Sequence, residues 1–115
     1  MVSMYGAYIK ERLGRGIIET EEGFATFEYP TDDIVYVVDI YVKPEHRRKR
    51  VAWEFMDIIS KQAKKDGKKS ILTSAEVASK GAEESIKAQK AYGMVEHKID
   101  GTMIFFIKSL EDEVV

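Results

Sequence analysis

Hydrophobic and polar residues alternate along this chain with the periods of strands and helices. Residues 34–42 form a nearly unbroken run of Ile, Val and Tyr, which predicts a strand at the centre of a sheet, covered on both faces. Residues 47–65 carry apolar side chains at three- and four-residue spacing, which predicts an amphipathic helix ended by Gly67. Its buried stripe comprises Val51, Ala52, Phe55, Met56, Ile59 and Ala63.

The remaining pattern predicts further strands and one more helix. A short strand over residues 70–75 completes a strand, helix, strand unit, whose two strands should run parallel and lie side by side or nearly so. Turn residues predict two hairpins, one around Glu21-Glu22-Gly23 and one around Asp100-Gly101. A helix over residues 82–92 should stop at Gly93.

The two ends of the chain are less regular. Residues 5–13 fit both a helical face and strand alternation, and we favour the helix while the strand stays open. Residues 110–115 form an acidic tail that we expect to fray.

Composition limits the classes of function. With 115 residues, 44% of them hydrophobic, the chain predicts a single domain over residues 1–115. The absence of cysteine excludes disulfides and a thiolate nucleophile, and the two histidines, His46 and His97, are too far apart in sequence to suggest a metal site. The N-terminus lacks a secretory signal and no window is long and apolar enough for a membrane span, so we expect a cytoplasmic protein.

The segment that joins the predicted central strand to the long helix suggests a binding site. The strand run stops at Pro44, and four basic residues follow: Arg47, Arg48, Lys49 and Arg50. The first turn of a helix has unpaired N–H groups and the positive end of the helix dipole, so it can bind phosphate. The pattern predicts an anion site, with a solvated first turn as the alternative. A net charge of −2 argues against nucleic acid as the ligand.

This segment resembles the GNAT superfamily of acetyl-coenzyme A dependent N-acetyltransferases, whose motif reads V-x-P-x-x-[Q/R]-x-x-G-x-[G/A]. Val42, Pro44, Arg47, Val51 and Ala52 fall on the pattern, whereas Arg50 replaces the first glycine. Glycine would let the backbone approach a diphosphate closely. Arg50 must therefore either adopt the same backbone with its side chain turned outward or contact the phosphate itself.

A second stretch, residues 82–94, resembles the family helix N-x-x-A-I-x-[LF]-Y-x-x-x-G-F. Ser85, Ile86 and Gly93 match, whereas Ala82 replaces the asparagine. Gln89 replaces the tyrosine that protonates the departing thiolate in many members, and a glutamine amide cannot give up a proton at useful pH.

The resemblance implies an α/β (α+β) fold: a mixed, mostly antiparallel central sheet of about six strands, with one splayed parallel pair and two to three flanking helices. It also implies acetyl-coenzyme A as co-substrate. The expected contacts are the backbone of Ile40, Tyr41 and Val42 for the pantetheine arm, residues 47–52 (Arg47, Arg48, Lys49, Arg50, Val51 and Ala52) for the diphosphate, and Gln89.

The resemblance further implies acetyl transfer to a primary amine, which could belong to a small molecule or to a protein or peptide. Asp39 is a candidate base that would take the amine proton, and the alternative is a structural role for its carboxylate. Tyr92 is a candidate acid that would protonate the thiolate, and the alternative is that it is simply buried in the core. The replaced positions also leave open a non-catalytic relative that binds the coenzyme or a protein partner. The sequence leaves the oligomeric state open, a homodimer included.

Overall fold

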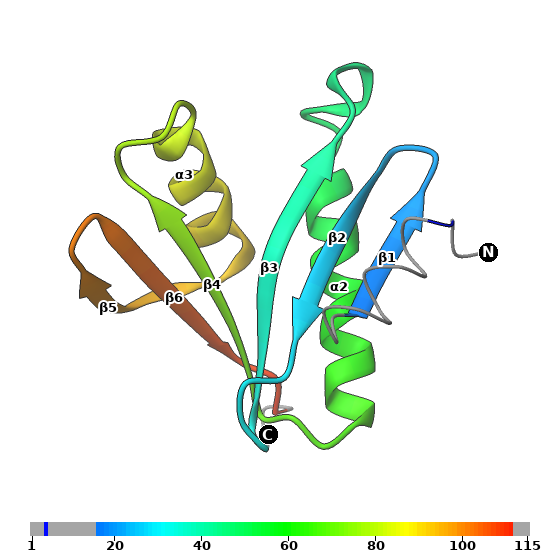
Figure 1. The fold of residues 1–115 in the computed structure, drawn as a ribbon, viewed down its shortest axis with the longest axis vertical. Coiled ribbons are helices and arrows are strands. Elements are labelled where there is room, and N and C mark those ends of the chain that lie inside the picture. Colours follow the sequence, from blue (N-terminus) through cyan, green and yellow to red (C-terminus); the bar gives the residue numbers. More distant parts are fainter. Residues whose placement is uncertain (1–3, 5–15, 112–115) are drawn as a thin grey trace.

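Six strands form one mixed sheet in the computed structural model, which describes Met4 and residues 16–111. Figure 1 shows the sheet with its helices. The elements are β1 (Gly16–Thr20), β2 (Gly23–Glu28), β3 (Ile34–Val42), a 3-10 turn (Pro44–His46), α2 (Val51–Lys65), β4 (Ser70–Glu76), α3 (Ala82–Tyr92), β5 (Val95–Asp100) and β6 (Met103–Ser109). The predicted helix over residues 5–13 lies outside the described residues.

The strands lie in the order β1-β2-β3-β4-β6-β5, and β3 and β4 form the one parallel pair within the described chain. This arrangement confirms the predicted fold class. The parallel ladder contains only three residue pairs and ends at Tyr36 opposite Leu72. Beyond this pair the two strands diverge, which gives the sheet its V shape (Figure 1).

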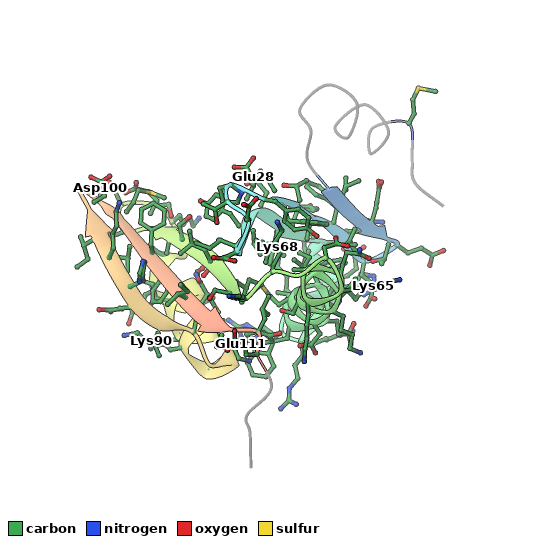
Figure 2. All side chains as sticks on the ribbon, turned by 90° about the horizontal axis from the view of Figure 1, so that it is seen from below. Glu28, Lys65, Lys68, Lys90, Asp100 and Glu111 are labelled. Atoms are coloured by element: carbon green, nitrogen blue, oxygen red, sulfur yellow. The ribbon has the colours of Figure 1, made fainter. Side chains whose placement is uncertain are left out.

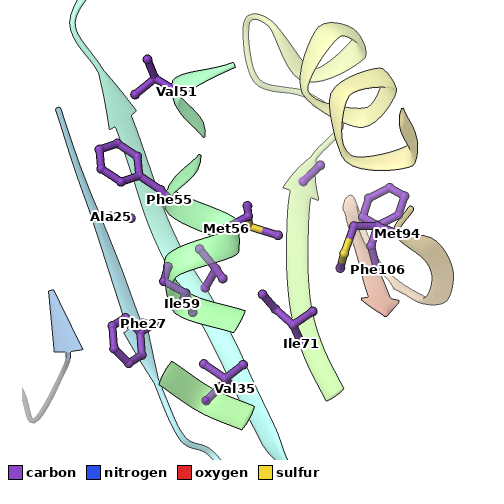
Figure 3. Packing of buried hydrophobic residues seen from close by; sticks show 13 residues of the cluster. Ala25, Phe27, Val35, Val51, Phe55, Met56, Ile59, Ile71, Met94 and Phe106 are labelled. Carbon is purple, nitrogen blue, oxygen red and sulfur yellow. The ribbon is translucent and has the colours of Figure 1, made fainter. Parts of the chain in front are cut away.

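The two described helices lie on the same face of the curved sheet, as the view along the strands shows (Figure 2). Helix α2 buries the predicted stripe against β2 and β3, except that Ala52 stays half-buried. Phe55 and Ile59 are fully covered, and Met56 points toward β4 (Figure 3). Burial of each large apolar side chain contributes about 1.5–3 kcal/mol, so α2 is fixed against the half of the sheet that ends in β3.

Strand β3 has the predicted bounds, but the expectation that both of its faces are covered is wrong. Its pairing with β2 shifts register, because Phe27 faces Val37 while Thr26 faces Asp39, which leaves Val38 as an extra residue. Such a bulge reverses the side-chain alternation. Asp39 and Tyr41 consequently lie exposed on the face opposite the helices.

Two predicted boundaries are also wrong. The helix expected from residue 47 begins at Val51, because Arg48 and Arg50 adopt left-handed backbone angles (φ 63° and 64°) that cannot continue a right-handed helix. Leu110, expected in the fraying tail, packs against the core, and its N–H donates to the Lys69 carbonyl at 2.8 Å.

Candidate functional site

Residues 47–50 form a turn that presents backbone N–H groups at the start of α2. Among the described residues, none accepts a hydrogen bond from the N–H groups of residues 48–53. The first backbone hydrogen bonds of the helix come later, beginning with the N–H of Glu54, which donates to the Arg50 carbonyl at 3.1 Å. Free N–H groups and the positive end of the helix dipole together favour an anion at this end of α2.

The basic side chains of this turn have separate contacts. Arg47 donates from Nε to the Val42 carbonyl at 2.9 Å, which ties the turn to the end of β3. The Arg50 guanidinium lies over the Trp53 ring, 5.4 Å from its centroid. Arg48 lies 3.8 Å from the Glu84 carboxylate on α3, and both side chains are largely exposed, so this ion pair stabilises little. Arg50 thus takes the backbone expected of a glycine while its side chain covers an aromatic ring.

An open groove of about 690 Å³ begins at this turn and runs between α2 and α3. It continues into an inner cavity of about 240 Å³, and four residues line both parts: Ala52, Trp53, Ser85 and Ala88. The inner cavity reaches the gap in which β3 and β4 have separated, where Val37 and Thr73 form its walls. One continuous passage therefore leads from the free N–H groups to the opening in the sheet.

The bulge in β3 shapes this inner cavity. Val37 and Ile40 both line it although they are three residues apart, because the extra residue between them restores Ile40 to the helix face. From Val37 onward, the edge of β3 that faces β4 has no ladder partner in that strand. Backbone groups along this edge are therefore available to a ligand.

Gln89 is held inside the cavity by two hydroxyl side chains. The Thr73 hydroxyl donates to the Gln89 side-chain carbonyl, and the Gln89 amide nitrogen donates to Ser85 Oγ at 3.1 Å. Thr73 is buried on β4 and Ser85 lies one helical turn before Gln89 on α3, so the three side chains link the strand to the helix. Gln89 can accept and donate hydrogen bonds here but supplies no acid.

Tyr92 lines the same cavity, but its hydroxyl is used elsewhere. It donates to Asp57 Oδ1 at 2.5 Å, and Lys108 Nζ lies 4.3 Å from the ring centroid. Burial of the phenol, together with the hydrogen bond to Asp57, raises the pKa of Tyr92 to about 12. Because the Tyr92 proton is already donated to the Asp57 carboxylate, it is not available to a thiolate in the cavity.

The groove brings together most of the residues that the sequence suggested. The following line one or both of its parts: Ile40, Val42, Arg47, Arg48, Arg50, Val51, Ala52, Gln89 and Tyr92. Tyr41, Lys49 and Asp39 do not line it. Asp39 and Tyr41 lie instead on the opposite face of the sheet, beside the outer opening of the gap.

Sequence reasoning missed the strand hydroxyls Thr73 and Ser74 and the role of Trp53 as a groove wall. Two consecutive hydroxyl residues within a strand were the signal for the first two. Trp53, the only tryptophan of the chain, stood off the apolar stripe of its helix, which is where a groove-lining residue belongs.

Helices on one face of a sheet, a splayed parallel pair and free N–H groups at a helix start define a protein class that binds an extended, anionic ligand between two strands. The sequence profile of the acetyltransferase (GNAT) family matches residues 14–94. The chain belongs to this family.

Solved structures share this fold. A protein assigned to the GNAT family from Desulfovibrio desulfuricans superposes with a TM-score of 0.76 at 12% identity, covering 91% of this chain and 78% of that one. The PaiA N-acetyltransferase of Thermoplasma acidophilum, solved with coenzyme A, gives a TM-score of 0.72 at 15% identity over 88% and 65% of the two chains. Ard1 from Thermoplasma volcanium gives 0.67 at 15% identity over 78% and 64%.

The chain therefore spans less than two thirds of the length of PaiA and of Ard1. No curated protein matches the chain. Within the described part of the chain, no helix has the length and apolar character needed to cross a membrane.

Proposed function

We propose that this protein transfers the acetyl group of acetyl-coenzyme A to a primary amine. The observation that carries the proposal is the continuous passage from the free N–H groups of residues 48–53 to the gap between β3 and β4. A diphosphate would bind to the free N–H groups, and an extended thioester arm would occupy the gap between the two strands. Acetyl-coenzyme A supplies both, together with an activated acetyl group.

The proposed contacts follow the groove. The N–H groups of residues 48–52 would hold the diphosphate, and the basic side chains around them would add charge. The free edge of β3 at Ile40, Tyr41 and Val42 would pair with the amides of the pantetheine arm, and the Gln89 amide could donate to the same arm. The groove volumes and the free edge fit a ligand of this shape.

The amine would approach from the face opposite the helices. Asp39 lies exposed on that face and is the proposed base, which takes the amine proton directly or through water. Tyr92 is the weaker candidate for the acid, because its hydroxyl already donates to Asp57. The acceptor is proposed to be a small amine or an amine of a protein or peptide.

A second candidate function is coenzyme binding without catalysis. The state of Gln89 favours it, because a side chain without an acidic proton is fixed by Thr73 and Ser85 at the position where many family members carry a tyrosine. Such a protein would keep the groove and act through a bound partner.

Calorimetric titration with acetyl-coenzyme A tests binding, and thiol release over a panel of amines separates the enzyme from the binding module. Ala88→Glu places a carboxylate in the groove and should weaken binding at least about tenfold by repulsion of the phosphates. Ala91→Glu, exposed on the same helix and outside the groove, is the matched control. No heat at high micromolar ligand contradicts both functions, whereas heat without thiol release supports the second.

A further inference from the structure

Two hydroxyl side chains meet where β3 and β4 begin to separate. Tyr36 belongs to the last parallel pair of the two strands, opposite Leu72, and Ser74 lies two residues farther along β4. The Tyr36 hydroxyl oxygen and Ser74 Oγ are 2.7 Å apart, the distance of a good hydrogen bond between hydroxyls. Because Tyr36 still belongs to the paired part of the sheet, this contact is rigidly placed.

Ser74 is also part of the wall of the inner cavity. Its neighbour Thr73 lines the cavity too, but the Thr73 hydroxyl proton is donated to Gln89. A phenol is a stronger acid than an alkyl hydroxyl, so Tyr36 is the natural donor in its pair and Ser74 the acceptor. In that arrangement the Ser74 hydroxyl proton has no hydrogen-bond acceptor among the described residues, at a position that borders the inner cavity.

The proposed acetyl transfer needs a proton donor in this gap, because cleavage of a thioester releases a thiolate. The other polar side chains of the cavity serve this need poorly. Gln89 has no acidic proton, Thr73 donates to Gln89, and Tyr92 donates to Asp57. Ser85 lies exposed on α3 rather than on a strand that borders the gap. The Tyr36 and Ser74 pair is the remaining hydroxyl contact that reaches the gap from the described residues.

We propose that Ser74 is the catalytic proton donor to the departing thiolate and that Tyr36, behind it, positions Ser74 and replaces its proton. The inference rests on the proposed acetyl transfer. The amine nitrogen bonds to the thioester carbon, and the carbon–sulfur bond breaks with its electron pair moving to sulfur. Sulfur takes the Ser74 hydroxyl proton while Ser74 takes the phenol proton of Tyr36. The tyrosinate recovers, through Asp39 and water, the proton that the amine loses, so the products are an amide and a thiol.

The test measures thiol release from acetyl-coenzyme A with one amine, together with the affinity for coenzyme by calorimetry. A proton donor acts on kcat, whereas a merely structural residue would also change the affinity. Ser74→Ala should lower kcat with acetyl-coenzyme A by about 10²- to 10⁴-fold, the usual contribution of a general acid, and Tyr36→Phe by about tenfold. Neither change should lower the affinity for coenzyme more than about threefold. Ser74→Thr keeps a hydroxyl and should restore most of the activity, which also covers the case in which Ser74→Ala fails to fold.

Ser70→Ala and Tyr29→Phe remove the same groups outside the cavity and serve as matched controls. An unchanged kcat in Ser74→Ala overturns the inference, and so does a loss of coenzyme affinity as large as the loss of kcat, which would indicate a structural role alone. Absence of thiol release by the unaltered protein with every amine has a different meaning: it overturns the transferase proposal and this inference with it.

Discussion

Arg47 donates a hydrogen bond from Nε to the carbonyl oxygen of Val42, 2.9 Å away and five residues earlier in the chain. The same guanidinium lies 5.9 Å from the centroid of the Tyr41 ring. Arg47 therefore connects the end of β3 to the turn that exposes the N–H groups of residues 48–53. We therefore propose that Arg47 contributes to coenzyme binding through its charge and through the geometry of the turn.

We predict that Arg47→Glu weakens acetyl-coenzyme A binding strongly, and that Arg47→Lys also weakens it although the charge is kept. Lysine cannot reproduce the Nε hydrogen bond and the planar stacking of the guanidinium. Loss of a charge-assisted hydrogen bond costs about 1.5–3 kcal/mol, or roughly ten- to a hundredfold in affinity. Titration calorimetry measures both, with Lys69→Glu, in the loop between α2 and β4 and outside the groove, as the control for charge. Full affinity in Arg47→Lys would show that charge alone matters.

Arg50→Gly tests the departure from the family motif. Arg50 has φ 64°, a left-handed angle that glycine adopts without strain. We predict that the variant preserves or improves coenzyme affinity, with Arg48→Gly (φ 63°) as the matched control for backbone relief. Tighter binding by the native protein than by Arg50→Gly would contradict this and show that the guanidinium over Trp53 is itself a ligand.

Two tyrosines should ionise late in an alkaline titration followed by tyrosinate absorbance. Burial and hydrogen bonds to Asp66 and Asp57 raise the pKa values of Tyr29 and Tyr92 to about 12. Because both folded-state pKa values exceed the unfolded value near 10, their stabilisation is complete below about pH 10 and lost as the pH rises through 12. Tyr29→Phe and Tyr92→Phe should each remove one late-titrating group. A late phase that survives in both variants would contradict the assignment.

Asp66 titrates in the opposite direction. Hydrogen bonds from Tyr29 and Gln62 lower the pKa of its carboxyl. Its contribution to stability is therefore present above the unfolded pKa of about 3.9 and is lost as the pH falls through the lowered folded value. Urea unfolding of Asp66→Asn against the native protein should show a difference at neutral pH that shrinks in acid. A difference that stays constant with pH would contradict this account.

The core side of α2 gives a prediction about stability. Ile59 is fully buried, so Ile59→Ala should destabilise the protein by about 2–5 kcal/mol and Ile59→Val by about 0.5–1.5 kcal/mol. Ile58 is its neighbour on the same helix and 42% exposed, and Ile58→Ala should cost about 0.5 kcal/mol or less. Urea unfolding measures all three. Equal losses at positions 58 and 59 would contradict the assigned buried face.

Local periodicity was sufficient to predict the elements of this fold. The bounds of β3 and α3 agree with the predicted residues 34–42 and 82–92, because an apolar β-branched run and a helix-ending Gly93 are local signals. The bulge at Val38 could not be predicted in this way, since it depends on how β2 and β3 align. It decides that Ile40 faces the cavity and Asp39 the opposite face.

Part of the candidate site could likewise be predicted from the sequence, and part could not. The motif around Arg47 located the turn, and the family glycine replaced by Arg50 was the signal for the left-handed angle there. The same angle at Arg48 had no signal in the sequence. The contact between Tyr36 and Ser74 joins residues 38 positions apart and arises only when the parallel ladder forms. Contacts of this kind require the assembled sheet.

The central claim is that the N–H groups of residues 48–53 bind the diphosphate of acetyl-coenzyme A. Nuclear magnetic resonance of the ¹⁵N-labelled protein during a coenzyme titration observes these groups directly. The account predicts saturable shifts of the amide signals of residues 48–53 and of the free edge of β3, with little change at residues 61–65 at the other end of α2. Coenzyme binding that leaves the amides of residues 48–53 unshifted, or no shift at any amide, would contradict it.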